Sequence, residues 1–306
     1  MLDRESLPES AFTHADRARL GLSADDLRMA VVDGLLRRPV RGSYRPRRGS
    51  DNALADLAAV ALARPHDVFI DRTAALIHGV DAYTRAEHDL TLSVEMCALR
   101  GSDPTELTGV DGRTRDLAPD DIVEVHGLRV TTPLRTAMDL GCNLRRREAF
   151  AAMNELARHH RLTVADLAAS LPRFRGRRGV VQLRQLIALL EPRVESQRES
   201  WTLLAIVDAG LPRPEPQHWI VLDGVPTFRL DFAYPGLRAC VEYDGVDAHQ
   251  QVPAQLEHDR QRRDWLRDHG WTVIVVRNGD FTGPALDRWL RELRAALATS
   301  YSVRRF

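Results

Sequence analysis

The sequence has 306 residues, of which 44% are hydrophobic and 28% charged; these values are ordinary for soluble globular proteins and leave room for two or three domains. The formal net charge is zero, so any attraction to nucleic acid depends on local patches of charge. All 43 basic residues are arginine. The absence of lysine excludes a phosphate-loop lysine, Schiff-base chemistry and a lysine general base.

The composition also points to a compartment. We find no long apolar run that would predict a membrane span, and the first ten residues, MLDRESLPES, are too polar for a signal peptide. Cys97, Cys142 and Cys240 are odd in number and lack zinc-type spacing, which is typical of a reducing setting. We therefore expect a cytoplasmic protein with no membrane partner.

Residues 1–50 predict a small helical module. The segment THADRAR indicates a short helix, and Ser23 then caps a second helix over ADDLRMAVVDGLL. Within that second helix, Leu27, Val31 and Leu35 recur at helical spacing.

A basic hairpin is predicted directly after these helices. The segment RRPVRGSYRPRR holds six arginines and no acid, and its Val40 and Tyr44 flank a turn at Gly42-Ser43. Two helices followed by a basic hairpin is the order of a winged helix-turn-helix, in which arginines neutralise phosphates. The alternative is a solvated basic loop beside a small helical bundle. The predicted DNA-binding residues are Arg37, Arg38, Arg41 and Arg45.

Residues 51–194 predict a mixed α/β domain. The segments DNALADLAAVALA, FIDRTAALIHGV and LRTAMDLGC read as helices, and HDLTLSV and GLRVTTP read as strands. Further helices follow in RREAFAAMNELARHH, VADLAASL and VVQLRQLIALLEP. The adjacent His159 and His160 have no partner at ligand spacing, so we expect them at the surface. We find no strong chemical motif here.

Residues 195–306 predict a helix, three antiparallel strands, a helix, a strand and a final helix. The first helix ends at Gly210, and Asp223-Gly224 is a strong signal for a hairpin turn. The segment RLDFAYPGLRACVEYDG continues as a second hairpin around Pro235-Gly236. A polar helix over about 254 to 269 then precedes the buried strand WTVIVVR.

Three acids lie inside these strands. If Pro235-Gly236 forms a two-residue turn, Asp231 lies opposite Cys240 and diagonal to Glu242, with about 7–8 Å between their backbones. Glu242 and Asp244 share that face. Converging carboxylates either take up protons or hold a hard cation, which predicts Mg²⁺ or Mn²⁺ on Asp231 and Glu242. The alternative is that the acids are buried partners of arginines such as Arg229.

Residues 195 to 290 resemble the very-short-patch-repair (Vsr)-like endonuclease domains of the PD-(D/E)XK superfamily. Asp231 falls on the motif aspartate of that family and Glu242 on the acid of its second motif. Ser196 and Glu199, in ESQRES, fall on its first-helix Ser and Glu, and VEYDG, His249 and HDRQRRDWLRDHGW resemble its third block. The resemblance implies a restriction-endonuclease-like αβββαβ core and metal-dependent hydrolysis of DNA.

One position departs from the superfamily. Its lysine is replaced by Asp244, so Asp244, His249 or Arg260 would have to take over the lysine's role, or the site is inactive. Each of these residues also has a purely structural interpretation. Asp244 can be a strand-end turn residue, Glu199 can serve a capping box with Ser196, and His249 can be a surface residue. Arg260 and Arg263 are either phosphate contacts or part of a solvated ion-pair face.

Residues 13 to about 150 resemble, more weakly, the abortive-infection (AbiEi-like) type IV antitoxins. The segments that carry this resemblance are RGSYRP, DRTAALIHG and GLRVTTPLRTAMDL. In that family a winged helix binds promoter DNA and the following domain neutralises a toxin.

The sequence therefore predicts three domains at 1–50, 51–194 and 195–306, and DNA as a partner. The first hypothesis is a Mg²⁺-dependent DNA endonuclease with an N-terminal DNA-binding module. The alternative is a DNA-binding regulator or antitoxin whose nuclease fold is inactive, with a toxin as its partner. A third hypothesis is a structure-specific repair protein that needs a partner protein.

Overall fold

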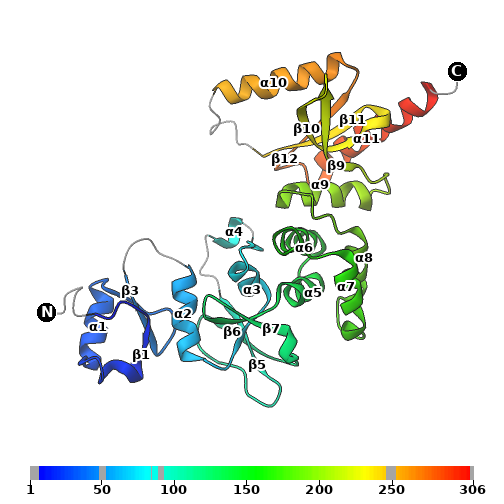
Figure 1. Cartoon of the computed structure of the whole chain (residues 1–306). Helices are drawn as coiled ribbons and strands as arrows, with labels where there is room; N and C mark the ends of the chain where they lie inside the picture. The colour runs from blue at the N-terminus through cyan, green and yellow to red at the C-terminus, as the bar shows by residue number, and fades with distance from the viewer. Residues whose placement is uncertain (1–6, 48–52, 84, 89–92, 246–252, 304–306) are drawn as a thin grey trace. The chain divides into compact units, whose positions relative to one another are not determined.

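The computed structural model describes residues 7–47, 53–83, 85–88, 93–245 and 253–303. The chain divides into two compact units, Met1–Leu140 and Gly141–Phe306, whose elements are labelled in Figure 1. Three sheets and many helices make this a mixed α/β chain, as predicted. The predicted boundaries at 50 and 194 fall inside the two units. None of the described helices is both long and apolar enough to cross a membrane.

The first unit begins with a three-stranded antiparallel sheet of order β1-β3-β2. Ser23 caps α1 as predicted: its Oγ accepts a hydrogen bond from the Asp26 amide at 3.1 Å, while the Asp26 carboxylate accepts one from the Ser23 amide at 2.8 Å. The predicted helix THADRAR is a single 3₁₀ turn. The elements are β1 (Phe12–Thr13), η1 (His14–Arg17), α1 (Ala24–Val32), β2 (Leu36–Arg37) and β3 (Ser43–Pro46).

The predicted hairpin is present as β2 and β3. Gly42, with φ +91°, ends the connecting turn in a conformation that favours glycine. Leu27 packs with Leu36 and Tyr44 in a small core beneath the hairpin. Val40, at the hairpin tip, packs instead with Leu57 of the next helix, and for this reason the hairpin is continuous with the rest of its unit.

A five-stranded mixed sheet of order β6-β5-β4-β8-β7 forms the centre of the first unit. β4 is parallel to β8 and β5 to β6, whereas β4/β5 and β7/β8 are antiparallel. The predicted helix FIDRTAALIHGV is shorter than expected: Phe69 ends β4, and the helix runs only from Asp71 to Ile77. The strands are β4 (Val68–Phe69), β5 (Val94–Leu99), β6 (Val110–Arg115), β7 (Ile122–Val125) and β8 (Leu128–Thr131). The helices are α2 (Ala53–Ala63), α3 (Asp71–Ile77), α4 (Arg85–His88), η2 (Pro119–Asp121) and α5 (Pro133–Asn143), which runs into the second unit.

The second unit opens with helices. The buried Asn154 of α6 joins two later segments: its amide donates a hydrogen bond to Ser200 Oγ at 3.2 Å and its carbonyl accepts one from the Glu191 amide at 2.9 Å. This satisfies a buried polar group and fixes α6 against α9. The helices are α6 (Arg146–His160), α7 (Val164–Ser170), η3 (Leu171–Phe174), α8 (Val180–Leu189) and α9 (Gln197–Asp208).

A four-stranded sheet of order β12-β11-β10-β9 follows α9. The pairs β9/β10 and β10/β11 are antiparallel. β12 is parallel to β11 because α10 makes the crossover between them. The predicted order of helix, three strands, helix, strand and helix is therefore confirmed. The elements are β9 (Glu215–Leu222), β10 (Val225–Tyr234), η4 (Pro235–Leu237), β11 (Ala239–Asp244), α10 (Pro253–Asp268), β12 (Thr272–Arg277) and α11 (Gly283–Val303).

The predicted register of β10 and β11 is wrong by two residues. Pro235-Gly236 is not a two-residue turn: η4 is followed by Arg238 in the left-handed conformation, with φ +48°. This longer turn puts Phe232 opposite Val241, so Asp231 lies directly opposite Glu242 instead of Cys240. A shift of two preserves the face of each side chain, and the two acids are closer than expected.

Candidate functional site

The basic hairpin presents only part of its charge to solvent. Arg38 and Arg41 are exposed. Arg37 is 40% exposed and its Nη2 lies 3.1 Å from Asp56 Oδ2, while Arg45 is only 5% exposed and is also ion-paired with Asp56. Arg45, which the sequence predicts to contact DNA, has its guanidinium buried and ion-paired with Asp56 of α2 in this structure.

The helix before the hairpin has a different surface. Asp25 is 83% exposed and Arg28 71%, and these two side chains pair at 3.0 Å. Met29 and Val32 are 48% and 74% exposed. This face of α1 combines exposed apolar side chains with an ion pair that has no net charge, in contrast to the basic hairpin.

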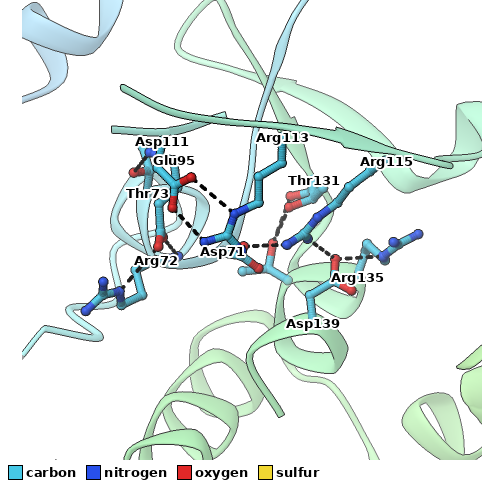
Figure 2. A network of polar contacts seen from close by, with 11 residues as sticks. Asp71, Arg72, Thr73, Glu95, Asp111, Arg113, Arg115, Thr131, Arg135 and Asp139 are labelled. Carbon is cyan, nitrogen blue, oxygen red and sulfur yellow. Dashed lines mark hydrogen bonds and ion pairs between the residues drawn. The ribbon is translucent and has the colours of Figure 1, made fainter. Parts of the chain in front are cut away.

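A second cluster of charges lies in the five-stranded sheet and was not predicted. Figure 2 shows that Arg115 of β6 reaches two acids from different helices: Asp71 Oδ2 at 2.5 Å and Asp139 Oδ2 at 2.8 Å. Arg135 of α5 binds Asp139 at 2.8 Å and Asp121 at 2.8 Å. We call Asp71, Arg115, Asp121, Arg135 and Asp139 the ion-pair network.

Burial makes the ion-pair network costly to disturb. The side chains of Asp71, Asp121, Arg135 and Asp139 are at most 4% exposed, and Arg115 is 12% exposed. Charges at this depth persist only when they are paired and hydrogen-bonded. Because its members come from β6, η2, α3 and α5, the network locks these elements around the sheet.

Three further charged residues extend this cluster. The Arg72 amide donates a hydrogen bond to Glu95 Oε2 at 2.6 Å, and the Glu95 amide donates one to Thr73 Oγ1 at 2.9 Å, as drawn in Figure 2. Burial, and secondly the charge of Asp71, raises the pKa of Glu95. Arg113 reaches Asp71 at 3.3 Å from the exposed edge strand.

The third cluster contains the acids predicted to bind metal. Asp231 Oδ2 accepts a hydrogen bond from the Tyr243 amide at 2.8 Å, which ties β10 to β11 beside the pair. Burial, then the charges of Glu242 and Glu199, raises the pKa of Asp231 to about 7. Burial also raises the pKa of Glu242. We call Asp231, Glu242 and Glu199 the acid cluster, because their charges act on one another at one site.

Only half of the capping box considered for Glu199 is seen in the described structure, and its role in a site stays a prediction. Ser196 caps α9 as predicted, with its Oγ accepting a hydrogen bond from the Glu199 amide at 3.1 Å. The Glu199 carboxylate is buried and accepts hydrogen bonds from the Glu195 amide at 3.0 Å and from Gln217 Nε2 at 2.8 Å. Its charge still acts on Asp231.

Two arginines of α10 contact acids of this sheet. Arg262 Nη2 lies 2.5 Å from Glu242 Oε2, and Arg263 Nη2 lies 2.9 Å from Asp244 Oδ2. The partner of Glu242 is therefore Arg262; Arg229, which was considered for that role, pairs with Glu195 at 2.8 Å. Arg263, expected to contact DNA, is engaged with Asp244 in this structure.

The donor set fits a divalent cation only poorly in this conformation. Within the described ranges, no three His, Cys, Asp or Glu side chains form a group able to hold a metal ion. Arg262 already supplies positive charge to Glu242. Two features favour an ion: Asp231 and Glu242 lie opposite each other, and Glu242 Oε1 is buried with no hydrogen-bond partner among the described residues.

The remaining predicted residues lie apart from these contacts. Arg260 is 77% exposed on α10, with its Nε 3.8 Å from Asp264. His249 lies outside the described residues.

Sequence reasoning missed the ion-pair network and Arg262. The i,i+4 pair Arg135 and Asp139, inside an otherwise apolar helix segment, was the one local signal of buried charge.

Comparison with known proteins places the chain among relatives. Residues 67–189 match the family model of the AbiEi antitoxin C-terminal domain. Over 257 residues the chain is 31% identical to two proteins named "Uncharacterized protein MT2308" of Mycobacterium tuberculosis (strain CDC 1551 / Oshkosh) and "Uncharacterized protein Rv2248" of strain ATCC 25618 / H37Rv. These alignments cover 83% of this chain and 90% of each relative. The family-model match ends before the segment 195 to 290, so it gives the nuclease resemblance no support.

Proposed function

The chain belongs to the same family as these two mycobacterial proteins and matches the AbiEi antitoxin C-terminal domain model at 67–189, and from this premise we propose that it is a DNA-binding, antitoxin-like regulator of the bacterial cytoplasm. The observation that carries the proposal is this family match at 67–189, which follows the basic hairpin and α2 along the chain. It favours the regulator hypothesis over the nuclease hypothesis.

The hairpin is the proposed DNA contact. Arg38 and Arg41 at its turn are exposed, and Arg47 is exposed at its far end. In a winged helix-turn-helix, such arginines bind phosphates and set the position of the protein on the duplex. The exposed face of α1 is apolar with one ion pair and is poorly suited to read bases, so the proposed interaction is mainly with the backbone and strongly dependent on salt.

The domain that matches the antitoxin family is the proposed binding site for a toxin. The ion-pair network supports this role because it holds β6, α3 and α5 in one arrangement before any partner arrives. A preformed surface loses less conformational entropy on association than a flexible one.

The test of DNA binding is a salt titration. We expect the full chain to bind duplex DNA from its own promoter region. Arg38→Gln/Arg41→Gln should lower the magnitude of the slope of log K against log salt by about 0.9 for each phosphate that is no longer neutralised. Arg100→Gln is the matched control, because Arg100 is 77% exposed and lies outside the hairpin. Equal slopes for wild type and the double variant would contradict the proposed interface.

A metal-dependent DNA endonuclease is the second candidate. It is favoured by the direct opposition of Asp231 and Glu242 and by the unpartnered Glu242 Oε1. A divalent cation held there would supply water activation and charge stabilisation at a phosphate. This candidate requires Arg262 to leave Glu242, since the two are 2.5 Å apart.

The second candidate has its own test. The purified protein is incubated with supercoiled plasmid and Mg²⁺ or Mn²⁺, with EDTA and Glu242→Gln as controls. Cleavage that EDTA and Glu242→Gln both abolish would establish the nuclease. If wild type neither cleaves nor shows a metal-dependent shift in Tm, the nuclease fold is inactive, because an ion bound only by the folded state raises its stability.

A further inference from the structure

Glu242 in the second unit has one carboxylate oxygen that is bonded and one that is not. Its side chain is 4% exposed, and its Oε2 lies 2.5 Å from Nη2 of Arg262. Its Oε1 is buried and has no hydrogen-bond partner in the described parts of the chain. Asp231 lies directly opposite on β10, and side chains in such positions have Cβ atoms about 4.5–5.5 Å apart. One cation can therefore contact both acids.

Arg262 of α10 already brings a positive charge to this position. Besides its contact with Glu242, it donates a hydrogen bond from Nη1 to the Arg229 carbonyl oxygen at 3.2 Å. Arg229 is two residues before Asp231 on β10, so the guanidinium bridges β10 and β11 beside the two acids. The Arg262 side chain is only 18% exposed. A pair at this depth is costly to break, because a buried charge would lose its partner.

The guanidinium satisfies the acids only in part. Arginine–carboxylate pairs are frequently bidentate, with two parallel N–H···O bonds. In this structure Arg262 Nη2 bonds to Glu242 Oε2, while Glu242 Oε1 and Arg262 Nε are both buried without a partner among the described residues. A hard divalent cation takes several oxygen ligands at once. Such an ion would use the oxygen that Arg262 leaves unbonded.

We propose that Arg262 is an internal cation that competes with a divalent metal ion for Glu242 and keeps the acid cluster closed to metal. An ion coordinated by Glu242 would meet the positive guanidinium at contact distance, and this repulsion is strong away from bulk water. Binding of the ion therefore requires Arg262 to leave Glu242. The inference rests on the acid cluster of the second candidate function, but it concerns cation binding alone and is independent of the hairpin.

The test measures Mn²⁺ binding to the full chain without DNA, by calorimetry and by melting. We expect Arg262→Gln to bind Mn²⁺ at least about tenfold more tightly than wild type, because it removes a positive charge that contacts Glu242. Mn²⁺ should raise the Tm of the variant and leave that of wild type unchanged, since an ion bound only by the folded state stabilises it. Equal affinity of the two proteins, or a folded Arg262→Gln protein that does not bind Mn²⁺, would overturn the proposal.

Two further variants locate the effect. Arg262→Gln/Glu242→Gln should lose the gained affinity, and if it keeps that affinity the ion binds elsewhere and the proposal is wrong. Arg263→Gln is the matched control, because Arg263 is the next residue of α10 and pairs with Asp244 at 2.9 Å. It should gain less affinity than Arg262→Gln, and an equal gain would mean that the total charge, and not the contact with Glu242, decides binding.

Two outcomes separate this inference from stability and from catalysis. If Arg262→Gln is unfolded without metal, Mn²⁺ should restore its folding, and a protein that stays unfolded in millimolar Mn²⁺ would contradict the proposal. Plasmid cleavage is scored separately. An Arg262→Gln protein that binds Mn²⁺ through Glu242 but does not cleave DNA supports the competition between the two cations and rejects the nuclease.

Discussion

The ion-pair network of the first unit and the acid cluster of the second both contain buried acids and arginines, but they differ in the ratio of arginines to acids. In the ion-pair network, Arg115 and Arg135 each reach two acids, and every pair that they form is 2.8 Å or shorter. In the acid cluster of Asp231, Glu242 and Glu199, the described residues supply one ion-paired arginine, Arg262, which contacts Glu242. Burial of charge therefore has two outcomes in one chain: a fixed scaffold where the charges match, and a protonatable site where they do not.

The largest effect on stability is expected in the ion-pair network. Arg135→Leu leaves the buried carboxylates of Asp121 and Asp139 without a shared partner, so we expect it to lower the free energy of unfolding by about 3–5 kcal/mol. Urea unfolding measures this change, with Arg100→Leu as the control at an exposed ion pair. A decrease smaller than that of the control would show that the network is not structural.

The next effect tests the unbalanced cluster. Arg262→Gln removes the arginine that is hydrogen-bonded to Glu242, whose side chain is 4% exposed, and we expect the free energy of unfolding to fall by about 2–3 kcal/mol at pH 8. The decrease should be smaller at pH 5, where the acid cluster can take up a proton. The measurement is urea unfolding at both pH values, and an equal decrease at both would argue against a shared proton.

A smaller and opposite effect is expected at Asp231. Its pKa of about 7 in the folded protein is above the ordinary value of 3.8. Between these values the folded state holds a proton that the unfolded state has released, so the stability of the wild type falls as pH rises from about 4 to 7. Asp231→Asn should therefore stabilise the protein at pH 8, on the order of 2 kcal/mol, and change little at pH 4.

Thermal unfolding across that pH range measures the Asp231 effect. Asp223→Asn is its control, since Asp223 lies in the exposed turn between β9 and β10. A destabilised Asp231→Asn protein at pH 8 would mean that the hydrogen bond from Tyr243 outweighs the repulsion between the acids.

The smallest effect on stability tests where the ion-pair network ends. Arg113 contacts Asp71 at 3.3 Å, but it is 42% exposed and also pairs with Asp111. Because water screens such a pair, we expect Arg113→Gln to lower the free energy of unfolding by less than about 1 kcal/mol. A decrease in stability close to that of Arg135→Leu would show that the ion-pair network also includes Arg113 at the edge of the sheet.

The sequence predicted local features well and long-range pairings poorly. The Ser23 cap and the order of elements after residue 195 depend on neighbouring residues, and both were correct. The register of β10 and β11 failed because Arg238 adopts a left-handed conformation that lengthens the turn. Arg115 in GRTR has the alternation of an exposed strand, and its partner Asp71 is 44 residues away, so nothing local showed their pairing.

The shared core of the hairpin and the sheet has a consequence for how this protein can be recombined. Arg45 is buried against Asp56, and Val40 packs with Leu57 and Phe69. A gene fusion or exchange with a breakpoint near residue 50 would leave the buried Arg45 without Asp56 and would expose the apolar core around Val40. A transferable piece therefore has to keep the hairpin together with α2 and the sheet, and the strength of the proposed DNA binding is more readily changed by substitutions at the exposed Arg38 and Arg41 than by exchange of the hairpin.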